Sequence, residues 1–172
     1  MARSTSPSGQ LARLGFAEPE RAERLLGDAS LAGLLTGPAV DVAQHGLAGA
    51  LSRAADPDLA LLALVRLAEA AARGDRDEQD GRQLMTTLRR TGHERDRLIA
   101  VLGGSRALGE HLVRHPEHWR CAADATRPTA EGLRTALVTA VSPHGRGRHP
   151  AYDALRIAYR RELLAIAALD LT

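Results

Sequence analysis

Three histidines, His111, His115 and His118, form the densest group of side chains capable of chemistry. Residues four apart share a helix face, so the first two have the spacing of metal ligands. Pro116 interrupts that helix, and no carboxylate or cysteine completes an evident tetrahedral set of the kind zinc requires. We therefore interpret them as surface and capping histidines, with a zinc site as the alternative.

A second motif, Leu102-Gly103-Gly104-Ser105, resembles the glycine-serine turn with which nucleotidyltransferases hold a triphosphate. In such enzymes acidic pairs follow the turn and hold Mg²⁺, which offsets charge during phosphoryl transfer. No Asp-x-Asp pair follows here, and Glu110 and Glu117 stand alone. The two glycines are therefore predicted to end a helix, and Ser105 to cap the next one.

The Asp-x-Asp pairs of the chain are Asp56-Pro57-Asp58 and Asp75-Arg76-Asp77. Both stand at predicted helix boundaries, where carboxylates interact favourably with the helix dipole or solvate a loop. Cys121 has no basic activator close in sequence and is predicted to be a buried thiol, and Trp119 a packing anchor. The sequence thus predicts no catalytic, cofactor-binding or metal-binding residue.

All 23 residues counted as Lys or Arg are Arg, yet the formal net charge is only +2 and the signs are interspersed. Residues 84–108 can be drawn as a helix-turn-helix with four arginines facing phosphates: Arg89, Arg90, Arg95 and Arg97. Glu94 and Asp96 reduce the positive charge of that face. We expect no nucleic-acid partner, and keep an Arg-rich nucleic-acid binder as a lesser alternative.

Helix start and stop signals punctuate the whole chain, and no alternating strand pattern of useful length occurs. The clearest helix is capped by Asp56 and runs to a stop at Gly74; it is apolar over most of its surface and should be central. Shorter helices are predicted on both sides, beginning near Pro19, Pro38, Leu84, Ser105 and Thr129, with a short apolar turn over 11–16. The predicted fold is an all-α, irregular multi-helix array or bundle without a sheet.

The predicted organisation is a disordered tail (1–8), a helical leader (9–141), an exposed loop (142–150) and a long helix (151–172). Along that helix Leu155, Tyr159, Leu163 and Ile166 are helically spaced, and we expect Leu163 and Ile166 to be incompletely covered. No apolar run approaches the ~20 residues that span a bilayer, and the first residues do not form a signal peptide. The predicted location is the cytoplasm, with no membrane partner.

Four stretches together resemble the N-terminal portion of glutamine synthetase adenylyltransferase in its actinobacterial form. They cover residues 13–26, 55–67, 96–119 and 155–171. The third is the most specific, because a Gly-Ser break, an Ala-Leu-Gly helix and a His-Pro-x-x-Trp turn follow in the family's order. The weakest similarity lies between Cys121 and Pro150.

The resemblance implies a long enzyme with two nucleotidyltransferase halves, one removing AMP from a tyrosine of glutamine synthetase by phosphorolysis and the other attaching AMP from ATP. Each half of such an enzyme uses a Gly-x-Gly-Lys-x-Gly-x-x-Glu-Leu motif and a Ser-Asp-x-Asp motif whose aspartates hold Mg²⁺. Neither motif is present here, so no catalytic residue of the family can be placed on this chain.

We therefore predict that the sequence is a helical leader that precedes a missing nucleotidyltransferase core. We expect this chain to be inactive alone and to bind neither Mg²⁺ nor ATP itself. The resemblance implies glutamine synthetase as a partner, with a PII-type regulator as a second one. The alternative is a self-contained helical protein-interaction module.

Overall fold

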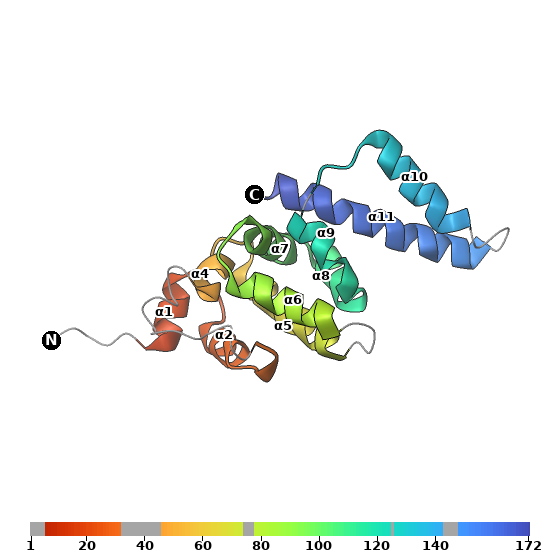
Figure 1. Ribbon diagram of the computed structural model, residues 1–172. Coiled ribbons are helices and arrows are strands. Elements are labelled where there is room, and N and C mark those ends of the chain that lie inside the picture. Colours follow the sequence, from red (N-terminus) through yellow and green to blue (C-terminus); the bar gives the residue numbers. More distant parts are fainter. Residues whose placement is uncertain (1–5, 32–45, 74–77, 125, 143–147) are drawn as a thin grey trace.

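Helix α5 (Pro57–Arg73) is the centre of the computed structural model, which describes residues 6–31, 46–73, 78–124, 126–142 and 148–172. It begins where predicted, because the Leu59 amide donates to Asp56 Oδ1 at 2.9 Å and Pro57 occupies the first turn. Helices α2, α6, α7 and α8 and η1 all pack against it (Figure 1). Seven of its residues are buried: Ala60, Leu61, Ala63, Leu64, Val65, Leu67 and Ala68. An all-round apolar helix is stable only in such a position, so its predicted centrality is confirmed.

Among the N-terminal helices, α2 (Pro19–Leu26), η1 (Ala29–Leu31) and α4 (Leu47–Leu51) pack against α5, and α1 (Pro7–Arg13) packs on α2. The predicted short turn over 11–16 is wrong in extent, because Ser6 accepts the Gly9 amide at 3.2 Å and thereby caps a full helix from Pro7. Leu47 and Leu51 are buried as predicted. Pro38 lies outside the described residues.

The second group comprises α6 (Glu78–Arg89), α7 (His93–Gly104), α8 (Arg106–Arg114), η2 (Pro116–His118) and α9 (Trp119–Asp124). Helix α7 approaches the start of α5 closely at Gly103. A Cβ at this position would lie 2.6 Å from Ala54 Cβ and 2.9 Å from the Asp56 carbonyl oxygen. Gly103 therefore does more than end a helix: it lets two backbones pack together.

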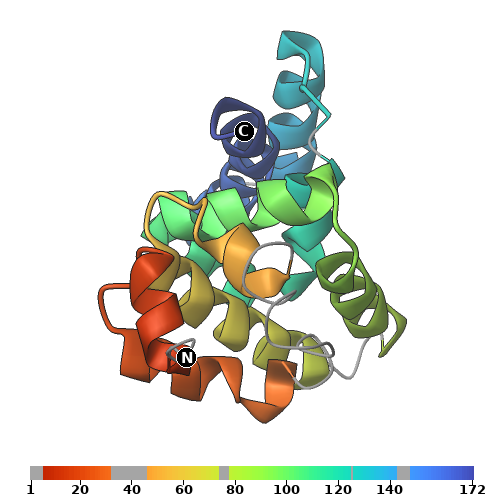
Figure 2. The ribbon, with the colours of Figure 1, turned by 90° about the vertical axis from the view of Figure 1, so that its left-hand side faces the viewer.

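The last two helices, α10 (Ala130–Val141) and α11 (Arg148–Asp170), form an antiparallel hairpin. Figures 1 and 2 show it projecting from one end of the molecule, opposite α1 and α2. Leu164 and Ala168 near the end of α11 are buried against the body, where α11 packs on α7 and α9. Helix α11 begins at Arg148, so part of the predicted 142–150 loop is helical.

Every regular element in the described ranges is a helix, which confirms the all-α prediction. Of these helices, none combines the length and apolarity needed to cross a membrane.

Candidate functional site

The three histidines come together where α8 ends. His115 leaves the helix with φ −130° and ψ 68°, and the η2 turn that follows places His118 against His111. The His111 Nε2 and His118 Nδ1 atoms are 3.0 Å apart. The ring centroids of the three side chains lie 4.9 to 5.4 Å from one another. Pro116 interrupts the helix as expected, and the interruption is what assembles the cluster.

Burial makes the charged form of this cluster unfavourable. His111 is only 2% exposed, and burial, followed by His118, His115 and Arg160, lowers its pKa to about 4. Burial also lowers the pKa of His118, although Glu117 opposes that shift. A 3.0 Å contact between two ring nitrogens needs one N–H donor and one bare nitrogen, so at least one of the two rings must be neutral.

The interpretation as surface and capping histidines is wrong for His111, which is buried and bonded to another histidine. The turn at Pro116 folds His118 onto His111, whereas an unbroken helix would place the two residues on one face but about two turns, ~10 Å, apart. Within the part of the chain that the structure describes, no group of three His, Cys, Asp or Glu residues is arranged to hold a metal ion.

Cys121 on α9 is half-buried and in contact with the core. The sequence predicted a buried thiol without a basic neighbour. The structure instead brings Arg161 of α11 to it, and the hydrogen bond to Cys121 raises the pKa of Arg161. No sequence signal could have revealed this neighbour, because the two residues lie on different helices separated by α10.

The first Asp-x-Asp pair is used by backbone donors, as the helix-boundary interpretation predicts. Asp56 caps α5, while Asp58 Oδ2 accepts the Ala17 amide at 2.7 Å and its Oδ1 accepts the Glu18 amide at 3.3 Å. The carboxylate of Asp58 thus supports the start of α2, whose own N-cap residue, Glu18, makes no capping bond with its side chain. The second pair, at 75–77, falls outside the described residues.

The glycine-serine turn is a helix boundary, as predicted. Ser105 Oγ accepts the Leu108 amide at 3.3 Å and caps α8. Glu110, further along α8, forms an ion pair with Arg66 of α5. This hydrogen-bonded pair lowers the pKa of Glu110 and raises that of Arg66. The ion pair joins α8 to α5, whereas the Ser105 cap acts within α8.

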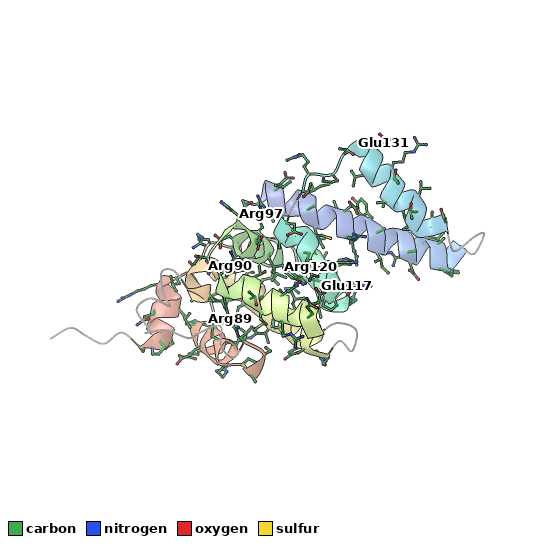
Figure 3. The ribbon with its side chains drawn as sticks, in the orientation of Figure 1. Arg89, Arg90, Arg97, Glu117, Arg120 and Glu131 are labelled. Carbon is green, nitrogen blue, oxygen red and sulfur yellow. The ribbon has the colours of Figure 1, made fainter. Side chains whose placement is uncertain are left out.

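The arginines of the helix-turn-helix alternative do not form a common face. Arg89 and Arg90 are exposed (Figure 3), but Arg95 is only 4% exposed. Arg97 donates from Nη1 to the Asp124 carbonyl at 3.4 Å. Because Arg95 is buried, it cannot reach a phosphate. One of the four arginines that the helix-turn-helix alternative requires is therefore excluded.

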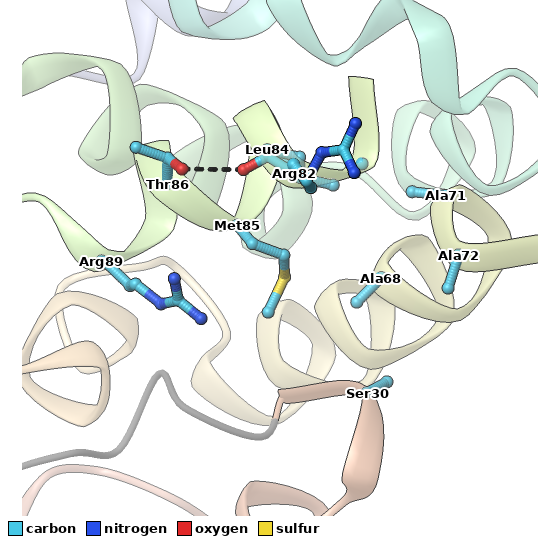
Figure 4. Close-up of a pocket in the computed structure, with 10 residues that line it drawn as sticks. Ser30, Ala68, Ala71, Ala72, Arg82, Leu84, Met85, Thr86 and Arg89 are labelled. Atoms are coloured by element: carbon cyan, nitrogen blue, oxygen red, sulfur yellow. Dashed lines mark hydrogen bonds between the residues drawn. The ribbon is translucent and has the colours of Figure 1, made fainter. Parts of the chain in front are cut away.

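A pocket of about 500 Å³ lies between η1, α5 and α6 (Figure 4). Met85 projects into it, Arg89 lies at its edge, and alanines of α5 form the opposite wall. Its described lining includes no carboxylate, histidine or cysteine. These side chains can hold an apolar group, and the hydroxyls of Ser30 and Thr86 have no carboxylate or histidine of the lining to act as their general base.

Comparison with known proteins confirms the resemblance drawn from the four stretches. The chain is 41% identical over 98% of its length to the bifunctional glutamine synthetase adenylyltransferase/adenylyl-removing enzyme of Streptomyces avermitilis. It is 43% identical over 98% of its length to the enzyme of the same name from Streptomyces coelicolor. The Mycolicibacterium smegmatis enzyme of that name is 46% identical over 70% of the chain.

The chain spans about 15% of the length of the two Streptomyces relatives. No family model matches the chain, and no solved structure matches it significantly.

Proposed function

We propose that this homologue of part of the bifunctional glutamine synthetase adenylyltransferase/adenylyl-removing enzymes is a non-catalytic helical segment that positions the catalytic parts of such an enzyme. The observation that carries the proposal is the pattern of similarity, which covers 98% of this chain but only 15% of the relatives. The enzyme class is a nucleotidyltransferase that modifies glutamine synthetase and reverses the modification.

The state of the acidic side chains supports a role without chemistry. Asp56 and Asp58 are bound to backbone amides, Glu110 pairs with Arg66, and Asp80 pairs with Arg120. The chain also contains no lysine. We therefore place the binding of ATP and Mg²⁺ in the parts of the enzyme that this chain does not cover, where metal-bound carboxylates would offset phosphate charge.

Glutamine synthetase is the partner we propose, since the relatives' name identifies it as the protein acted upon. A PII-type regulator is the second proposed partner. The supporting feature is charge asymmetry: residues 41–81 are rich in acids, whereas the stretch from Arg127 onward is rich in Arg. Such asymmetry can steer association with a charged surface.

The decisive experiment replaces the matched segment of the S. avermitilis relative with this chain. AMP transfer to glutamine synthetase and AMP removal from it are then measured for the chimera, for the same relative without the segment, and for the 172-residue chain alone. We expect both activities in the chimera, loss of both on deletion, and none in the chain alone. Full activity after deletion, or AMP transfer by the chain alone, would refute the proposal.

A self-contained helical interaction module is the second candidate, and exposed apolar side chains on α10 and α11 favour it. That function requires the chain alone to bind glutamine synthetase or a PII-type protein in calorimetry. The chimera would then be no more active than the deletion variant. A nucleic-acid binder would instead show an affinity that falls steeply with salt.

A further inference from the structure

The aromatic residues differ in their exposure to solvent. The chain contains one Phe, one Trp and two Tyr. Phe16 and Trp119 are core residues, 4% and 5% exposed, whereas Tyr152 and Tyr159 are 60% and 53% exposed. Both tyrosines lie on α11. Tyr is enriched at protein interfaces because its ring buries a large apolar area while its hydroxyl remains able to bond.

The two tyrosines line one groove of about 570 Å³ along the α10–α11 hairpin. We call this the hairpin groove; its apolar lining is Leu137 of α10 with Tyr152, Leu155 and Tyr159 of α11, and its polar lining is His149, Asp153 and Arg156. The α11 positions 149, 152, 153, 156 and 159 follow helical spacing, so they form one continuous stripe.

The groove is uncovered because α10 has no second neighbour of substance in the described structure. It packs on α11, and none of its residues is fully buried. The large apolar side chains exposed in the described ranges are Val138, Tyr152, Leu155, Ile157, Tyr159 and Leu171. All but Leu171 belong to the hairpin. Concentration on one element distinguishes a binding surface from scattered exposed residues.

Leu163 and Ile166 are half-buried, which agrees with the expectation that they are incompletely covered. The second half of α11 packs on the body, so the most exposed apolar side chains of this helix lie in its first half. That anchoring leaves the first half of α11 projecting with its tyrosines on a regular helix. A surface held this way loses little conformational freedom when a partner binds.

We propose that the hairpin groove is the docking surface for the remainder of the enzyme polypeptide, the portion outside the segment that this chain represents. This inference rests on the proposed function. About 85% of each Streptomyces relative lies beyond the matched 15%. A polypeptide of that length can cover the hairpin groove. Its contact with the groove would explain why two tyrosines are exposed when this segment is alone.

The polar residues of the groove indicate a protein surface as the occupant. Asp153 and Arg156 form an exposed ion pair at 3.7 Å, so an acid and a base lie within the same stripe as the tyrosines. A lipid surface would favour an apolar stripe flanked by basic residues, and a polyanion would favour basic residues alone. An aromatic centre with mixed charges at its edge is typical of protein interfaces.

The test compares hydroxyl-radical footprinting of the chimera described above with that of the chain alone. Docking should bury Tyr152 and Tyr159 to about the level of Trp119, which is 5% exposed, so we expect their modification rates to fall about tenfold in the chimera. Trp119 should react equally slowly in both samples and so reports an intact fold. A Tyr152→Glu/Tyr159→Glu chimera should lose activity, whereas Thr139→Glu, at an exposed α10 position outside the groove, should keep it.

The outcomes separate this inference from the proposed function. An active chimera whose two tyrosines react as fast as in the chain alone would overturn the docking surface and leave the proposed function standing. An inactive chimera whose tyrosines are nevertheless protected would support docking and count against the function. If light scattering showed the chain alone to be a dimer with both tyrosines protected, the occupant would be a second copy, and the inference would be wrong.

Discussion

Acidification should destabilise the fold through His111. Its side chain is 2% exposed and its pKa is lowered from 6.5 to about 4, mainly by burial. A group whose pKa is lower in the folded state contributes stability above its unfolded pKa, and this stability is lost as pH falls towards the folded pKa. The relevant window therefore runs from 6.5 down to about 4.

The size of the effect follows from linkage. Over this window the unfolded chain binds a proton at His111 and the folded chain does not. The free energy of unfolding therefore falls by about 2 kcal/mol between about pH 7.5 and about pH 5. The full difference between the unfolded and folded pKa values of His111 corresponds to a total loss of about 3 kcal/mol in the free energy of unfolding, reached below about pH 4. Burial of His118, which lowers its pKa too, acts in the same direction. A loss of this size is a substantial part of the ~5–15 kcal/mol that stabilises a typical domain.

The assay is urea denaturation followed by circular dichroism across this pH range. The midpoint should fall by about 1 M, given a slope of about 2 kcal/mol/M. In His111→Gln the decrease should be clearly smaller, because the side chain no longer titrates, whereas His93→Gln, an exposed residue on α7 outside the cluster, should behave like the unsubstituted chain. Equal pH dependence in His111→Gln and the unsubstituted chain, or an NMR titration placing the pKa of His111 near 6.5, would refute the reasoning.

Three further substitutions test the packing, each by the free energy of unfolding in urea. Gly103→Ala should cost about 1–3 kcal/mol, because the new Cβ would lie 2.6 Å from Ala54 Cβ; an unchanged midpoint would contradict the close approach. Leu64→Ala should cost about 2–5 kcal/mol by leaving a cavity in the centre of α5, and a cost below about 1 kcal/mol would show that this helix is not central. Asp58→Ala should cost about 1 kcal/mol by removing the acceptor of the Ala17 amide, while Asp58→Asn should recover part of the loss; no recovery would exclude a capping role.

Local chemistry allowed much of the fold to be predicted. Asp56, Ser105 and Thr129 each cap the helix that the sequence predicted for them, because a capping bond joins residues only three positions apart. The all-α class followed from the same signals and from apolar spacing along each segment. Most prediction errors at helix ends, such as the start of α11 at Arg148, are of a few residues.

Only the tertiary structure decided which side chains meet and which remain exposed. His118 folds back on His111, Asp58 supports the start of α2, and Arg161 reaches Cys121 from another helix. The exposure of Tyr159 was equally hidden, since its helical spacing matches that of a buried stripe. The physical reason is the range of the interactions: a cap or a helical period is complete within a few residues. Burial and pKa depend on neighbours that the chain brings together only when the helices pack.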